Sequence, residues 1–249
     1  MFALLLAIAV LFFPAWCLPA HGRSSILFES NTNVQAALVA IKAVDAKKVY
    51  VKNGRKILAA EERLGQGIII DPSGIILTNT HILGMAKHIL VTLDSKEILE
   101  ASFLYSGTDD FSFLKITAPK PLRAIPWTDF ARIAPGDPVI AFNNKQHVLG
   151  GTISRLIQEK SSDRIEFLEL DVNLEHGDSG GPILDEQGCL LGLIMARRES
   201  NEHKSLAISS AMIRQSYLHH NGSVLVGEES PPPQELPLLP EQPERSEQK

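Results

Sequence analysis

Short runs of apolar and β-branched residues, bounded by turn residues, recur along most of the chain. The clearest are two runs within residues 65–79, joined by Asp-Pro-Ser-Gly in a sequence typical of a hairpin turn. Asn53-Gly54 is a second hairpin-turn signal. Residues 34–43 and 49–52 predict short strands or a helical turn leading into one. The same pattern predicts further strands at 88–93, 98–105, 111–116, 139–142, 148–157, 165–172, 183–184 and 190–196.

One segment, residues 209–218, has a convincing helical pattern. Many short strands with a single long helix indicate an all-β protein, either a sandwich or a pair of β-barrels. The run Ala118-Pro119-Lys120-Pro121 predicts a joint between two halves of the chain.

Residues 1–20 are almost wholly apolar and carry no charged side chain. This pattern predicts a secretory signal peptide cut near Ala20, because the run is short for a membrane span. The lack of Lys or Arg at its start keeps an uncleaved anchor as the alternative, and a membrane tether follows only in that case. If the leader is removed, Cys189 is the one cysteine left, and no intrachain disulfide can form.

The C-terminal residues 223–249 hold six Glu against one Arg and one Lys, which accounts for −4 of the net charge of −5. The remaining body is near neutral, so its charge indicates no nucleic-acid partner. The tail is rich in Pro and Glu and has too few apolar residues to fold, so we expect it to be disordered. A Pro-rich docking peptide is the functional alternative for this segment.

The segment 176–184, His-Gly-Asp-Ser-Gly-Gly-Pro-Ile-Leu, places Ser179 in a frame of glycines. A serine nucleophile needs a neighbouring base and a tight backbone that aims amide N–H groups at an oxyanion. Pro182 and the apolar residues after it predict a buried strand that supports this loop. The alternative is an ordinary β-turn, which uses the same residue types.

A serine nucleophile requires a histidine base and a carboxylate elsewhere in the chain. His81 follows the predicted hairpin, where a strand ends in a short polar turn. Asp110 stands at the start of an apolar strand, and its neighbour Asp109 is the second choice. The alternatives are a surface or core histidine and an aspartate that only caps a turn.

These three segments, in the order His, Asp, Ser, resemble the trypsin-fold serine proteases. Residues 65–71 with 78–81, then 110–116, then 177–182, are most similar to the bacterial HtrA-like protease domain. The resemblance covers about residues 34–217.

The resemblance implies two perpendicular six-stranded β-barrels, residues 34–118 and residues 122–220 with the helix, and an active site between them. It implies that Ser179 attacks the peptide carbonyl, that His81 transfers its proton and that Asp110 orients the imidazole. It also implies that the N–H groups of Gly177 and Ser179 form the oxyanion hole. No metal or cofactor is expected.

Two features depart from the family. HtrA-like proteins usually continue into PDZ domains, and the residues after the final helix are too few for one. Asp178 also replaces the asparagine common in that branch. In animal trypsins this aspartate pairs with a new N-terminal ammonium, but the chain has no Ile-Val-Gly-Gly start to supply one.

The resemblance also implies a substrate pocket. Its floor is Asn173, six positions before Ser179, and its wall and rim include His176, Met195 and Ala196. An uncharged floor would leave a bound Arg or Lys side chain unpaired, which is costly in a closed pocket. We therefore expect cleavage after medium-sized uncharged residues such as Val, Ala or Leu.

The sequence as a whole predicts a periplasmic or secreted serine endopeptidase that acts on proteins or peptides. The competing hypothesis is a catalytically silent trypsin-fold binding protein. The natural substrate and the oligomeric state do not follow from the sequence.

Overall fold

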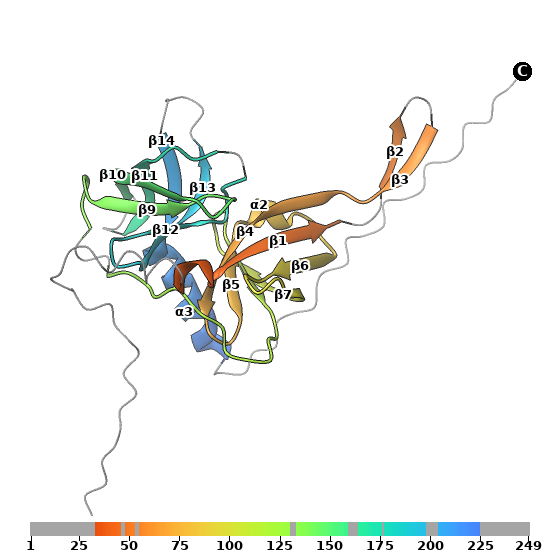
Figure 1. The fold of residues 1–249 in the computed structure, drawn as a ribbon, viewed down its shortest axis with the longest axis horizontal. Coiled ribbons are helices and arrows are strands. Elements are labelled where there is room, and N and C mark those ends of the chain that lie inside the picture. The colour runs from red at the N-terminus through yellow and green to blue at the C-terminus, as the bar shows by residue number, and fades with distance from the viewer. Residues whose placement is uncertain are drawn as a thin grey trace, which may run out of the picture.

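Two closed β-barrels and a C-terminal helix make up the computed structural model (Figure 1). It describes residues 33–45, 48–52, 55–129, 133–158, 164–175, 177–197 and 204–224. Each barrel has six strands, and the strand pairs are antiparallel. The predicted all-β fold with two barrels is therefore confirmed, and the alternative of a β-sandwich is wrong.

The first barrel has the strand order β1-β4-β5-β8-β7-β6. Its strands are β1 (Leu38–Val44), β4 (Glu62–Asp71), β5 (Ile75–Thr78), β6 (His88–Thr92), β7 (Ile98–Ser106) and β8 (Ser112–Lys115). The predicted hairpin turn joins β4 to β5, where Gly74 N–H donates to the Asp71 carbonyl over 3.0 Å. Gly74 has a φ of +98°, a conformation that favours glycine.

A separate two-stranded sheet, β2 (Lys48–Lys52) with β3 (Arg55–Ala59), projects away from the first barrel between β1 and β4 (Figure 1). The strand predicted at residues 49–52 is confirmed. The turn residues Asn53-Gly54 lie outside the described residues.

The second barrel has the order β10-β11-β14-β13-β12-β9. Its strands are β9 (Pro138–Phe142), β10 (Val148–Gln158), β11 (Ile165–Asp171), β12 (Pro182–Leu184), β13 (Leu190–Arg197) and β14 (Lys204–Ser209). The sequence pattern did not predict β14, because its apolar run, residues 206–208, is short and has a serine on each side. The hydroxyls of Ser205 and Ser209 donate to the carbonyls of Val172 and Ile165. These tertiary partners make a polar strand residue acceptable in the interior.

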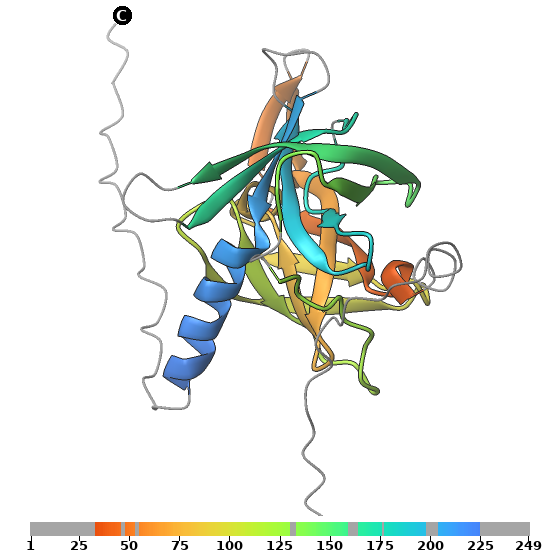
Figure 2. The ribbon, with the colours of Figure 1, turned by 90° about the vertical axis from the view of Figure 1, so that its left-hand side faces the viewer.

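The helix α3 (Ser210–Val224) follows β14 directly and extends beyond the predicted end at residue 218. Figure 2 shows it running along the side of the molecule. Met212 and Ile213 are buried. Tyr217 lies 5.7 Å from the Phe113 ring and 6.3 Å from the Trp127 ring, measured between centroids. Because Phe113 belongs to β8, the helix that ends the second barrel also packs against the first.

The chain between β8 and β9 contains the predicted joint at residues 118–121 and is bonded to both barrels. Ile125 N–H donates to the Ile69 carbonyl of β4 over 3.0 Å. Leu190 N–H, at the start of β13, donates to the Pro126 carbonyl over 2.7 Å. One cluster of buried apolar side chains includes members of both barrels. The barrel interface is therefore a packed core that fixes groups on its two sides relative to one another.

Several predictions from the sequence concern residues that the structure does not describe. These are the leader at residues 1–20, the tail from residue 225 and His176. No helix within the described ranges has the length and apolar character needed to cross a membrane. Cys189 is disulfide-bonded. The expectation that no intrachain disulfide forms applies to the chain without its leader and stays a prediction.

Candidate active site

His81 lies in a single helical turn, α2 (Thr80–Leu83), that begins where β5 ends. The buried residues Thr78 and Asn79 bring the chain out of the first barrel at this point. The Asn79 amide donates to the Asp110 carbonyl over 2.8 Å. This bond joins the start of α2 to the loop before β8. The His81 side chain itself is 52% exposed and can reach a bound molecule.

Asp110 contacts both the ring and the backbone of His81. Its Oδ2 lies 2.6 Å from His81 Nδ1, and its Oδ1 accepts the His81 N–H over 2.9 Å. The hydrogen bond from Asp110 raises the pKa of His81, and the negative charge of Asp110 adds to this while burial opposes it. Asp109 instead accepts the Thr108 hydroxyl. The structure therefore brings His81 together with Asp110, as the sequence predicted, and not with Asp109.

Ser179 lies across the barrel interface, in the tight loop before β12. Its neighbours Gly177 and Gly180 have φ values of +99° and +83°, which explains the glycine frame. A Cβ on Gly180 would stand 2.1 Å from the Gln66 carbonyl oxygen, so space also requires glycine there. Among the described residues, the Ser179 hydroxyl donates to the Met195 carbonyl over 3.1 Å and not to the His81 ring.

Asp178 is 2% exposed and finds partners that the sequence did not reveal. Its Oδ1 accepts the N–H of Asn144 over 2.9 Å, and its Oδ2 accepts the N–H of Glu175 over 2.8 Å. Two backbone amides thus stabilise the carboxylate in the place of an N-terminal ammonium. Asn144 is 34 residues away in the chain, and no local pattern could have identified it.

Residues 65–193 match the protein family described as the trypsin-like peptidase domain. The match covers more than half of the chain and includes His81, Asp110 and Ser179. The chain belongs to this family.

Relatives in the family agree with the HtrA-like resemblance. The serine endoprotease DegS of Escherichia coli K12 is 37% identical over 142 residues, covering 52% of this chain and 39% of DegS. A probable periplasmic serine endoprotease, DegP-like, of Rickettsia conorii is 33% identical over 140 residues, covering 52% and 28%. The chain therefore spans well under half the length of these relatives.

A solved structure of the HtrA-type protease AlgW with a decapeptide has the same fold. The TM-score is 0.65 with 21% identity, and the match covers 80% of this chain and 68% of that one.

The predicted substrate pocket of this family member is described only in part. Asn173 is exposed and Met195 is half-buried beside Ser179. Ala196 lies on β13, but its side chain is outside the described residues, as is the whole of His176.

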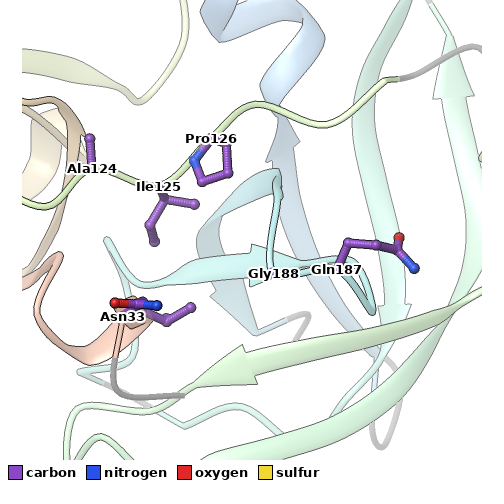
Figure 3. Close-up of a pocket in the computed structure, with 7 residues that line it drawn as sticks. Asn33, Ala124, Ile125, Pro126, Gln187 and Gly188 are labelled. Atoms are coloured by element: carbon purple, nitrogen blue, oxygen red, sulfur yellow. The ribbon is translucent and has the colours of Figure 1, made fainter. Parts of the chain in front are cut away.

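A pocket of about 210 Å³ lies elsewhere and contains none of the predicted site residues (Figure 3). Asn33, Val34, residues 124–126 and the turn at 187–188 line it. We assign it no part in the candidate site. Within the described part of the chain, no three His, Cys, Asp or Glu side chains are grouped as a bound metal ion would need.

Proposed function

We propose that this chain is a serine endopeptidase that hydrolyses peptide bonds through an acyl-enzyme. The observation that carries the proposal is the two-point contact between Asp110 and His81, through the ring and the backbone. A carboxylate that accepts both N–H groups favours one imidazole tautomer, with the proton on Nδ1 and the lone pair on Nε2. His81 Nε2 is then the atom that can take a proton from Ser179.

The reaction begins with the Ser179 hydroxyl, which leaves the Met195 carbonyl and donates to His81. We propose that this exchange takes place by rotation about the serine Cα–Cβ bond. The Ser179 Oγ attacks the substrate carbonyl while its proton moves to His81, and the imidazolium then gives that proton to the leaving amine. The N–H groups of Gly177 and Ser179 are the proposed oxyanion donors, and the loss of one such donor typically costs about 3 kcal/mol.

The substrate is proposed to be a protein or peptide, cleaved after medium-sized uncharged residues in the pocket formed by Asn173, His176, Met195 and Ala196. The periplasm or the cell exterior is the proposed location, supported by the predicted leader 1–20 and by the name of the DegP-like relative. We further propose that residues 34–118 and 122–220 are the two barrel units. The disordered tail predicted at residues 223–249 is proposed to begin after α3, at residue 225, because α3 extends to Val224.

A second candidate function is that of a catalytically silent binding protein with the same fold. The hydrogen bond of Ser179 to Met195, rather than to His81, favours it. A fluorophosphonate probe distinguishes the two functions, because only an activated serine reacts. We expect one adduct on Ser179, identified by peptide mass spectrometry and absent in Ser179→Ala. A folded protein that forms no adduct would support the silent binding protein.

A further inference from the structure

Gln66 is a residue of the first barrel whose side chain reaches the loop of the second barrel that carries Ser179. It lies on β4 and is 7% exposed. Its Nε2 donates to the Asp178 carbonyl over 3.2 Å, and the Gly177 carbonyl lies 3.5 Å away. A primary amide has two N–H groups and can serve both oxygens. The buried side chain is thus held by partners more than 100 residues distant.

The contact with Asp178 has a consequence for Ser179. The Asp178 carbonyl and the Ser179 N–H belong to one planar peptide unit, and the described chain has no cis peptide bond. In a trans unit these two groups point in opposite directions. A bond that fixes the carbonyl therefore fixes the direction of the N–H. Gly181 N–H also donates to this carbonyl, over 3.1 Å, so Gln66 supplies the donor that comes from outside the loop.

The backbone of Gln66 holds the next peptide unit. Its N–H donates to the Ser179 carbonyl over 3.3 Å, and the N–H of that unit, from Gly180, donates to the Ile194 carbonyl over 3.1 Å. Gln66 therefore contacts the peptide units on both sides of Ser179. The nucleophile cannot change its backbone orientation without breaking a bond to β4.

Gln66 is also joined to the other half of the site. The Thr78 hydroxyl donates to the Gln66 carbonyl over 2.7 Å, and both residues are buried. Thr78 directly precedes Asn79, whose side chain is bonded to the Asp110 carbonyl. A short series of hydrogen bonds thus connects the loop of Asp110, the end of β5 and the loop of Ser179.

We propose that the Gln66 side chain is a positioning residue that orients the Ser179 N–H as an oxyanion donor. The proposal rests on the proposed function, since an oxyanion forms only if Ser179 acts as a nucleophile. The side chain does not touch the reacting atoms. Its effect is exerted through the Asp178–Ser179 peptide unit, and it contributes mainly when negative charge develops in the transition state.

The test compares Gln66→Met, which keeps the length of the side chain but removes the donor, with Gln66→Glu, which replaces the donor by an acceptor. For Gln66→Met we expect kcat on a peptide amide to fall by about 10- to 100-fold with KM within about threefold, because a misdirected donor costs less than an absent one. Gln66→Glu should lose at least as much at pH 8, since its carboxylate faces two carbonyl oxygens.

A peptidyl aldehyde separates positioning from a general loss of structure. Its inhibition constant should rise by the same factor as kcat/KM falls, because its tetrahedral adduct uses the oxyanion donors. The control is Gln187→Met, an exposed glutamine on the turn before β13, which should change neither value.

Three outcomes overturn the inference. They are a kcat within twofold of the wild type in both Gln66 variants, a loss of activity without weaker aldehyde inhibition, and failure of both variants to fold. The reaction of the wild-type protein with a fluorophosphonate distinguishes failure of the proposed function from failure of the proposed role of Gln66. If its Ser179 forms no fluorophosphonate adduct, the proposed function fails, whereas an adduct with unchanged Gln66 variants rejects only the role of Gln66.

Discussion

At the scale of single residues, the contact between His81 and Asp110 decides the proton chemistry. The carboxylate stabilises the imidazolium, so the pKa of His81 is raised above its ordinary value of 6.5. A base must be unprotonated to accept a proton. The activity should therefore be lost as the pH falls through this raised pKa and be full above it.

Asp110→Asn is expected to lower kcat by about 10⁴-fold, because the amide favours the wrong imidazole tautomer. It should also move the midpoint of the profile of kcat/KM against pH down toward 6.5, because the group that raises the pKa is gone. Initial rates on a peptide substrate from pH 5 to about 9 measure both effects. Asp109→Asn is the matched control and should change neither. If it has the larger effect, the carboxylate was assigned to the wrong neighbour.

At the scale of the element, the loop of Ser179 is held from within its own barrel by Asp178. The carboxylate accepts the N–H of Asn144 from one loop and that of Glu175 from its own. Each carboxylate oxygen of Asp178 faces an N–H donor, so the surroundings of this side chain suit two acceptor atoms and no donor. This explains how a buried charge is tolerated at a position where an ammonium partner is absent from the sequence.

Asp178→Asn should destabilise the protein, although asparagine is common at this position in the branch. The asparagine side chain has one acceptor oxygen and one NH₂ donor. The NH₂ group would face one of the two backbone N–H groups that Asp178 binds, and that buried N–H would lose its acceptor. We expect the free energy of unfolding to fall by about 1 to 3 kcal/mol. Urea denaturation measures this. Glu186→Gln removes the same charge from an exposed turn and should be nearly neutral. Equal stability of the two variants would contradict the structural role of Asp178.

At the scale of the whole molecule, α3 and the connector hold the two barrels in a fixed relation. Tyr217 of α3 lies against Phe113 of the first barrel and Trp127 of the connector. The site needs this fixed relation, because His81 and Asp110 come from one barrel and Ser179 from the other.

Tyr217→Ala should lower the free energy of unfolding by about 2 to 4 kcal/mol, because it removes a partly buried ring and its contacts across the barrels. Urea denaturation followed by circular dichroism is the measurement. Leu218→Ala changes the adjacent residue, which is 57% exposed, and is expected to stay within about 0.5 kcal/mol of the wild type. An equal loss in the free energy of unfolding for both variants would show that the Tyr217 ring does not stabilise the packing of α3 against the barrels.

The sequence by itself determined the strands with clear apolar runs and the hairpin at Asp71–Gly74, because these depend on local backbone preferences and on alternation along the chain. It also supplied Ser179, His81 and Asp110 as candidates from their local sequence context, and the family resemblance then implied their roles.

Only the tertiary structure decided how the polar groups are paired. The buried serines of β14, the Asn144 amide that binds Asp178 and the bonds of Gln66 to the Ser179 loop all join residues far apart in the chain. A hydrogen bond between distant segments leaves no periodic trace in the sequence. It is set when the chain closes into barrels and the barrels pack together, because buried donors and acceptors lose water and need partners within the protein.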